Sequence, residues 1–293
     1  MPPDGSPAKG TSMEYSAEFI KTILARHGKV LKKSLGQNFL FDKRILDAIV
    51  GASVEKQDGN IVEIGAGVGL LTNLLCENSA RVVTVEIDDS LPPMLAETVP
   101  HPHFSLHLED ILKVDLAALA DRYFAGGRFS VVGNLPYYIT AKILDKLTAN
   151  RDLFDRAVIM VQKEVAERLQ STPGSKEYRA ATLTTNALFE IEYICTVPPH
   201  CFVPAPHVES AVIRLTPKQD CGIHKEDIPA FLTFVHSAFA ARRKQLKGQA
   251  KALSSTSDKI AAALVSLGFA ETARAEELAA EEMIRFFYLL QNS

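Results

Sequence analysis

Cysteine is scarce in this sequence, and metal-ligating patterns built on it are missing. The 293 residues contain four cysteines, Cys76, Cys195, Cys201 and Cys221. None forms a Cys-x-x-Cys pair or lies near a matched pair of histidines. This spacing argues against a disulfide framework and a zinc site, and it is typical of reduced thiols in a cytosolic protein.

Long apolar runs are also missing. No window approaches eighteen consecutive apolar residues, so we expect no membrane span. The first residues, MPPDGSPAKGTS, have neither the apolar core of a signal peptide nor the arginine-rich face of a transit peptide. We therefore expect residues 1–12 to form a disordered tail and the protein to be cytoplasmic.

Excess charge of one sign is absent overall but present locally. The net charge of −3 alone argues against a nucleic-acid partner. However, the segment from Lys21 to Arg44 has seven Lys or Arg and one acid, and the segment from Ala240 to Lys251 has five and no acid. Such segments are often merely solvated faces, but they can also bind phosphates on a mildly acidic protein.

Short apolar runs alternate with helical patterns along most of the chain, which predicts a mostly parallel α/β sheet. The expected strands are Ile61–Ile64, Arg81–Ile87, Phe104–Leu108, Phe129–Gly133, Arg156–Val161, Ile191–Val197 and Ser210–Leu215. The last two have no helix between them, so we expect an antiparallel pair at one edge.

Only helical patterns follow residue 226, after the segment TPKQDCGIH (216–224), which has no apolar periodicity. We place a domain boundary there. The expected division is a methyltransferase-like domain over residues 13–217 and a small all-helical C-terminal domain over residues 222–293.

A glycine-rich turn follows the first expected strand, in Glu63-Ile64-Gly65-Ala66-Gly67-Val68-Gly69. Glycines at this place let the backbone approach a ligand closely. A dinucleotide fingerprint would need a sixth-position glycine, where Leu70 stands. The Gly-x-Gly-x-Gly spacing, with an acid two residues before it, resembles that of S-adenosylmethionine (SAM) methyltransferases.

Acids also end the next two strands. Glu86 ends the second and can accept both ribose hydroxyls, and Asp110 after the third can accept from the adenine amino group. Each has an ordinary alternative, a solvated strand end or a helix cap. Ligand-suited residues at three consecutive strand ends together favour an adenosyl cofactor.

The fourth strand ends in Asn134-Leu135-Pro136-Tyr137, which resembles the (Asn/Asp)-Pro-Pro-(Tyr/Phe) cluster of amine N-methyltransferases. The adenine N6 lone pair is delocalised and poorly nucleophilic. The Asn134 side-chain oxygen and the Leu135 carbonyl can each accept one N6–H, which favours a more tetrahedral nitrogen. Pro136 fixes the turn, and Tyr137 offers a face for the base. Positioning suffices, so no metal is expected.

A paired base must be flipped or already unpaired to enter such a pocket. Phe202 lies in the long proline-rich loop PPHCFVPAPHVE between the last two expected strands. It is a candidate for a second stacking face. The alternative, an anchor of the loop on the core, remains open.

These pieces resemble one family, the KsgA-type rRNA adenine N6,N6-dimethyltransferases. The matching segments are KKSLGQNFL (32–40), EIGAGVGLLT (63–72), VEID (85–88), EDIL (109–112), VVGNLPYYIT (131–140), MVQKEVAERL (160–169), VPPHCFVPAPHVESAVIRL (197–215) and FAARRKQL (239–246). The resemblance implies a Rossmann-like SAM-binding domain followed by a small helical domain. It also implies dimethylation of two adjacent adenosines in the 3′-terminal hairpin loop of small-subunit (16S) rRNA. The implied substrate is an assembling 30S-type subunit, and we expect a monomeric enzyme.

The resemblance adds cofactor contacts in the Gln37–Leu40 segment, which residue patterns alone did not indicate. The expected cofactor set is Gln37, Asn38, Leu40, Gly65, Gly67, Glu86, Ile87, Asp110, Ile111 and Asn134. The expected catalytic set is Asn134, Leu135, Pro136, Tyr137 and Phe202. The sequence departs from the family pattern at Arg179, at Gln245 and at Lys247-Gly248, which bears on RNA docking rather than on the chemistry.

Three alternatives differ in class. A resistance-type methyltransferase acting on large-subunit rRNA is disfavoured by Leu135 and by the VPPHCFVPAP segment. A non-enzymatic RNA-binding factor related to the family is disfavoured by the intact catalytic residues. An NAD-dependent dehydrogenase is disfavoured by Leu70.

Overall fold

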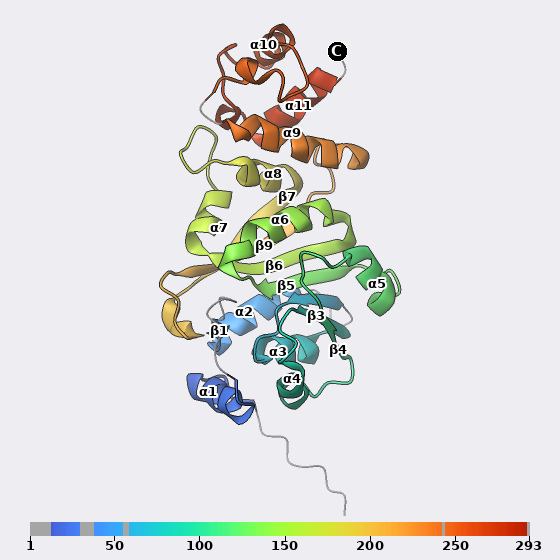
Figure 1. The fold of residues 1–293 in the computed structure, drawn as a ribbon, viewed down its shortest axis with the longest axis vertical. Helices are drawn as coiled ribbons and strands as arrows, with labels where there is room; N and C mark the ends of the chain where they lie inside the picture. The colour runs from blue at the N-terminus through green and yellow to red at the C-terminus, as the bar shows by residue number, and fades with distance from the viewer. Residues whose placement is uncertain (1–12, 30–37, 55–58, 242–243, 292–293) are drawn as a thin grey trace, which may run out of the picture.

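The structure, a computed structural model, describes residues 13–29, 38–54, 59–241 and 244–291. The molecule is elongated, with a sheet at its centre, helices α9 to α11 at one end and α1 (Ala17–Arg26) at the other (Figure 1). The predicted tail, residues 1–12, lies outside the described residues.

A seven-stranded sheet has the strand order β4-β3-β2-β5-β6-β9-β7. The strands are β2 (Asn60–Ile64), β3 (Arg81–Glu86), β4 (Phe104–Leu108), β5 (Phe129–Asn134), β6 (Phe154–Gln162), β7 (Phe189–Val197) and β9 (Ser210–Pro217). The first five pair in parallel, and β9 pairs antiparallel with both β6 and β7. The predicted parallel sheet with an antiparallel edge is confirmed.

The strands differ from the predictions mainly at their ends. β6 begins at Phe154 and β7 at Phe189, two residues earlier than expected in each case. In both, a buried phenylalanine is followed by an exposed acid, Asp155 or Glu190, so the apolar run starts later in the sequence than the strand does. The acid thus interrupts the apolar run at the start of each strand.

Helices cover both faces of the sheet and form two separate cores. The helices are α2 (Lys43–Ser53), α3 (Leu70–Asn78), α4 (Pro92–Thr98), α5 (Leu116–Phe124), α6 (Thr140–Ala149), α7 (Lys163–Leu169), α8 (Ala180–Leu188), α9 (Ile228–Ala240), α10 (Ser257–Ser266) and α11 (Ala280–Gln291). One core contains residues of α1 to α4, and the other contains residues of α5 to α11. In β6, Ile159 faces the second core and Met160 the first, as the alternation of a strand requires.

Polar side chains fix several helix starts. Asp42 caps α2 by accepting the N–H of Arg44, and Asp115 caps α5 by accepting from Ala117 and Ala118. Such caps satisfy backbone donors that the helix itself cannot.

A second, two-stranded sheet joins distant parts of the chain. β1 (Phe39–Leu40) pairs antiparallel with β8 (Phe202–Val203), which lies in the long loop between β7 and β9. The N–H of Phe41 also donates to the carbonyl of Cys201 at 3.0 Å. The predicted irregular loop therefore contains a strand, and its partner is the segment after Gln37.

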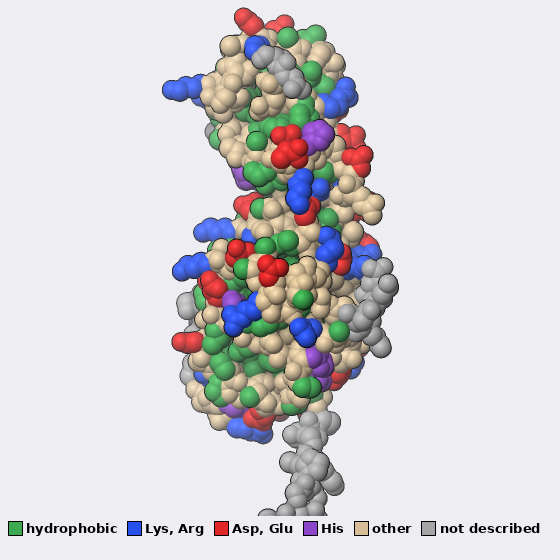
Figure 2. Space-filling view, turned by 90° about the vertical axis from the view of Figure 1, so that its right-hand side faces the viewer, with side chains coloured by type: hydrophobic (Ala, Val, Ile, Leu, Met, Phe, Trp, Pro, Cys, Tyr) green, Lys and Arg blue, Asp and Glu red, His purple; other side chains and the backbone are tan. Residues whose placement is uncertain are grey.

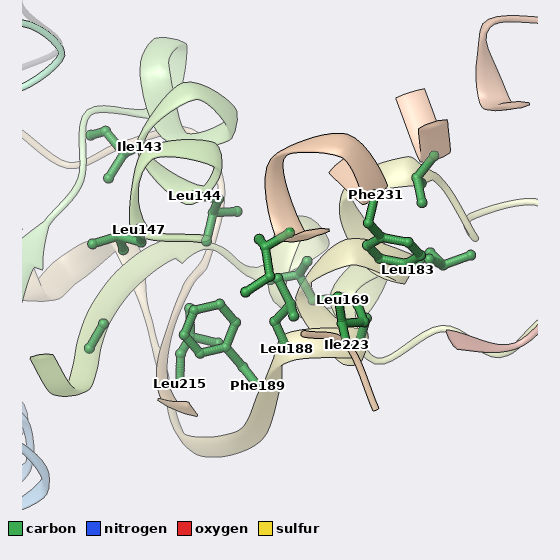
Figure 3. Packing of buried hydrophobic residues seen from close by; sticks show 14 of the residues in the cluster. Ile143, Leu144, Leu147, Leu169, Leu183, Leu188, Phe189, Leu215, Ile223 and Phe231 are labelled. Atoms are coloured by element: carbon green, nitrogen blue, oxygen red, sulfur yellow. The ribbon is translucent and has the colours of Figure 1, made fainter. Parts of the chain in front are cut away.

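The C-terminal helices share a core with the sheet. Figure 3 shows Phe231 of α9 beside Leu183 of α8, with Ile223 and Leu188 nearby, and all four are buried. The cluster then continues through Phe189 and Leu215 to Ile143 on α6. The predicted boundary near residues 217–222 stays a prediction, but apolar contact is continuous across it.

Candidate cofactor and adenine site

A cavity of about 220 Å³ lies at the carboxyl ends of the parallel strands. Of the expected cofactor residues, it is lined by Asn38, Leu40, Gly65, Gly67, Glu86, Ile87, Asp110, Ile111 and Asn134. Leu135, Pro136 and Tyr137 line it as well. Gln37 lies outside the described residues. The structure thus brings nine of the ten expected cofactor residues and four of the five expected catalytic residues to one place. This place is the usual ligand site of an open parallel sheet.

The glycine loop has the backbone shape that glycine alone adopts easily. Gly65 and Gly67 have φ angles of 81° and 55°. A Cβ on Gly65 would meet nothing within 4 Å, so the loop leaves open space there, on the cavity side. A Cβ on Gly67 would come within 2.9 Å of the Phe39 ring, so the segment containing β1 packs directly on the loop.

Glu86 is held rigidly beside the glycine loop. Its Oε2 accepts the N–H of Ala66 at 3.0 Å, and its Oε1 accepts those of Ile87 and Asp88 at 2.9 Å. Burial raises the pKa of the Glu86 carboxyl, while these three N–H groups act in the opposite direction. The carboxylate is therefore oriented before any ligand binds, as a ribose-binding acid needs to be.

Asp110 is oriented in a similar way. Its Oδ1 accepts the N–H of Leu112 at 2.9 Å, in the turn that follows β4. This bond closes a turn and caps no helix, because α5 begins at Leu116 with Asp115 as its N-cap. The helix-cap alternative for Asp110 is therefore wrong. The carboxylate stays at the cavity, together with Ile111.

The Asn134 side chain has one defined orientation. Its Nδ2 donates to the backbone carbonyl of Asn38 at 3.0 Å. A carbonyl can only accept, so this contact identifies the nitrogen end of the amide. Oδ1 is then the end that can accept from a ligand in the cavity. A backbone contact 96 positions away in sequence thus fixes which end of the Asn134 amide remains as an acceptor.

The residues after Asn134 are also fixed. The Leu135 side chain is fully buried, and its N–H donates to the carbonyl of Met160 at 3.1 Å. The Pro136 carbonyl accepts from Ile139 N–H and Thr140 Oγ1, which closes a turn. Tyr137 shares a 2.7 Å hydrogen bond with Ser210 Oγ, and burial raises the pKa of its phenol. Its ring is therefore neutral and anchored.

Glu63 also lines the cavity, although it is absent from the expected cofactor set. It is fully buried, and its Oε2 accepts from Thr72 and Thr84 at 2.7 and 2.6 Å. Within the described part of the chain, its Oε1 has no hydrogen-bond partner. Burial raises the pKa of Glu63 to about 7. The sequence already indicates Glu63 as the acid two residues before Gly65.

Phe202 does not line the cavity. It is 3% exposed and pairs with Leu40 across the two-stranded sheet, one layer behind the cavity wall. This position agrees with the loop-anchor alternative. A stacking role for Phe202 stays a prediction, and it requires the β8 segment to rearrange.

The basic segments are partly neutralised in the structure. Lys43 pairs with Asp47 at 2.7 Å and Lys247 with Glu271 at 3.4 Å. Figure 2 likewise shows Lys or Arg interspersed with Asp or Glu on the face it draws. Residues 30–37 and 242–243, which hold much of the remaining positive charge, lie outside the described residues.

Neither a metal cluster nor a membrane span is found in the described part of the chain. Its residues include no group of three or more His, Cys, Asp or Glu placed to hold a metal ion. None of the helices among them is both long and apolar enough to cross a membrane.

The cavity suits SAM. An oriented acid stands at the end of β3, an acid and Ile111 follow β4, and a glycine cradle leaves room between them. Glu63 adds a buried carboxyl to the cavity wall, and its Oε1 has no hydrogen-bond partner among the described residues. With Asn-Leu-Pro-Tyr at the next strand end, fold and site define the class of Rossmann-like methyltransferases acting on amino groups.

Comparison with known proteins narrows this class. The family described as "Ribosomal RNA adenine dimethylase" matches residues 28–292. The chain belongs to this family.

Similar proteins of known name support this family membership. The chain is 37% identical over 268 residues to the "Ribosomal RNA small subunit methyltransferase A" of Lachnoclostridium phytofermentans, covering 90% of this chain and 92% of that protein. It is 44% identical over 227 residues to the protein of the same name from Shouchella clausii, covering 76% of each chain.

Solved structures share the fold. A dimethyladenosine transferase from Plasmodium falciparum superposes with a TM-score of 0.73 at 23% identity, covering 87% of this chain and 98% of that chain. The 23S rRNA methyltransferase ErmE superposes with a TM-score of 0.66 at 24% identity, covering 87% and 100%. At these identities the likeness concerns the fold alone.

Proposed function

We propose that this protein transfers methyl groups from SAM to the N6 amines of two adjacent adenosines in the 3′-terminal hairpin loop of small-subunit rRNA. Family membership and the small-subunit methyltransferase relatives support the reaction and the substrate class. The single observation that carries the chemistry is the hydrogen bond from Asn134 to the Asn38 carbonyl, which leaves Oδ1 as an acceptor at the cavity.

When bound, SAM supplies an electrophilic methyl group on a sulfonium. The chain's own residues prepare the nucleophile. In the first transfer, Asn134 Oδ1 and the Leu135 carbonyl accept the two N6 hydrogens. In the second transfer, one of them accepts the hydrogen that remains. Both arrangements direct the nitrogen lone pair away from the ring. The anchored, neutral Tyr137 ring provides a face for the base, worth ~1–3 kcal/mol. Each transfer forms one N–C bond while the C–S bond to the methyl group breaks, and S-adenosylhomocysteine leaves with the electron pair on sulfur. The methylated nitrogen then loses one proton to solvent.

We also propose that the substrate is an assembling 30S-type subunit and that the enzyme acts in the cytoplasm as a monomer. One chain supplies the glycine loop, the acids and the Asn-Leu-Pro-Tyr segment, which supports action by a single copy. A base in a hairpin loop is unpaired, so it enters the cavity at a smaller unstacking cost than a paired one.

The test is methyl transfer from labelled SAM to small ribosomal subunits that lack the modification, with large subunits as the control. We expect N6,N6-dimethyladenosine in small-subunit RNA alone after nucleoside analysis. Label in large-subunit RNA instead would favour the resistance-type activity. SAM binding without transfer to either would favour a binding factor. Precursor subunits at different assembly stages, compared in the same assay, test the assembling substrate.

A further inference from the structure

Tyr138 is the most exposed of the described large apolar side chains, and it lies at the cavity. Its exposed fraction is 61%, yet it lines the same cavity as Asn134 and Tyr137. The two neighbouring tyrosines differ sharply in setting. Tyr137 is anchored to Ser210 by its hydroxyl, whereas Tyr138 presents its ring to solvent. An exposed aromatic ring beside a ligand cavity is typical of a binding surface.

The backbone that carries Tyr138 is rigid. Residues 137–139 form a short 3₁₀ helix, which continues directly into α6. The N–H of Ile139 and the hydroxyl of Thr140 both bond to the Pro136 carbonyl, at 3.1 and 3.2 Å. The position of the ring is therefore set by the same turn that aims the Asn-Leu-Pro-Tyr acceptors.

A cation follows Tyr138 closely along the chain. Lys142 is four residues further along, in the first turn of α6, and it is exposed. Tyr138 lies in the 3₁₀ helix and Lys142 at the start of α6, so about one helical turn separates the exposed ring from the exposed ammonium. We call these two side chains the strip. Lys146, one turn later, donates to the Val114 carbonyl at 2.5 Å, which brings the exposed Lys113 beside α6.

The chemistry of this strip fits a nucleotide. An aromatic face accepts any base by stacking, and a lysine at a distance of one helical turn can reach a phosphate. A small-molecule cofactor does not need the strip, because the acids and the glycine loop already line the cavity. An RNA loop that places one adenosine in the cavity necessarily leaves its neighbouring nucleotide at the mouth.

We propose that Tyr138 and Lys142 form a second nucleotide subsite, in which Tyr138 stacks on the base next to the target adenosine and Lys142 contacts the adjoining phosphate. This inference rests on the proposed function and extends it. Tyr138 holds the RNA in register while the neighbouring residue, Tyr137, contacts the reacting base. The same subsite would hold the already modified neighbour during the second round of transfer.

The test compares the variants Tyr138→Phe, Tyr138→Leu and Tyr138→Ala with the wild type on unmodified small subunits. Phe keeps the π face, Leu keeps only apolar bulk, and Ala removes both. We expect Leu and Ala to raise Kd and KM for subunits by about 5- to 150-fold, the equivalent of one stacked base. We expect Phe to stay within about threefold of wild type, and kcat and SAM affinity to change little in all three.

Lys142 has its own matched pair. Lys142→Ala should reduce the salt dependence of subunit binding by about one ion, whereas Lys142→Arg should preserve it. Equal salt slopes for Ala, Arg and wild type would overturn the phosphate contact.

The outcomes separate this inference from the proposed function. Wild-type protein that transfers methyl groups to small subunits, with Tyr138→Ala matching it in Kd and KM, overturns the inference alone. A parallel loss of SAM affinity, or a loss in Phe as large as in Leu, also overturns it. Wild-type protein that neither methylates nor binds small subunits refutes both.

Discussion

Burial raises the pKa of the Glu63 carboxyl well above the ordinary value of a glutamate. It is fully buried, two threonine hydroxyls donate to one oxygen, and its other oxygen has no partner within the described residues. The folded protein therefore holds a proton up to about pH 7, whereas the unfolded chain releases it near pH 4.5. An ammonium in the cavity would favour the ionised form instead.

The variant Glu63→Gln should show how the ionisation of Glu63 affects the free energy of unfolding. Between pH 4.5 and 7 the folded wild type binds more protons at this site than the unfolded chain, so its contribution to the free energy of unfolding falls as pH rises. Gln cannot ionise. The stability of the variant relative to wild type should therefore rise through this window and level off above it, by on the order of 1–3 kcal/mol. Denaturant unfolding at several pH values measures this difference.

The same variant should bind SAM more weakly, and most clearly above pH 7. There the wild type can offer an ionised oxygen to the ammonium, and the amide cannot. Calorimetric titration of SAM at pH 6 and pH 8 checks this. A stability difference that does not depend on pH, or unchanged SAM affinity at pH 8, would show that Glu63 is only a core residue.

Asn134→Ala should fold but lose methyl transfer by about 100-fold or more, because it removes an acceptor aimed at the reacting nitrogen. Asn134→Asp is the matched comparison. It keeps an acceptor oxygen but loses the N–H that bonds to the Asn38 carbonyl, so it should lose activity as well. Single-turnover transfer rates at saturating SAM measure both. A near-normal rate for Ala would rule out the role given to Oδ1.

At the scale of elements, the sequence predicted the strand ends, which depend on local patterns. It did not predict the pairing of β1 with β8, which depends on contact between distant segments. The strand ends with Gly65, Glu86 and Asp110 followed from apolar runs and from the geometry of parallel sheets. The pairing of Leu40 with Phe202 could not be read from spacing, because 161 positions separate β1 from β8 and each strand has two residues. Such short strands carry no periodicity, and only the family resemblance indicated the 37–40 segment.

The glycine loop and β1 should act as one element. Gly67→Ala would place a Cβ about 2.9 Å from the Phe39 ring and force a φ of 55° on alanine. Displacing Phe39 also disturbs Asn38 and Leu40, which line the cavity. We therefore expect SAM affinity to fall by about tenfold or more, measured by titration calorimetry.

Gly174→Ala is the matched control for this variant. Gly174 has a φ of 81°, but a Cβ at this position would meet nothing within 4 Å, so alanine there adds backbone strain without a clash. Its stability should fall by about 1 kcal/mol, and its SAM affinity should stay unchanged. Equal loss of SAM affinity in both variants would attribute the effect to strain rather than to the Phe39 contact.

At the scale of the molecule, the C-terminal helices share hydrogen bonds and apolar contacts with the rest of the chain. Tyr178 Oη donates to the Leu278 carbonyl at 3.2 Å, and the N–H of Gly174 donates to the Glu276 carbonyl at 2.7 Å. Phe231 is fully buried in the cluster that extends to the sheet (Figure 3). The helical spacing of apolar residues after residue 226 predicts separate helices. It does not indicate how much of the hydrophobic core these helices share with α8.

We therefore expect one cooperative thermal transition for the whole chain, and we expect SAM to raise its midpoint as a unit. Phe231→Ala should lower that single midpoint by the equivalent of about 3–5 kcal/mol, because it opens a cavity between α8 and α9. Val265→Ala on α10, where the side chain is 56% exposed, should change it by less than about 0.5 kcal/mol. Differential scanning calorimetry with and without SAM measures all three. Two transitions, with SAM raising one and Phe231→Ala lowering only the other, would show that the helices fold as a separate domain.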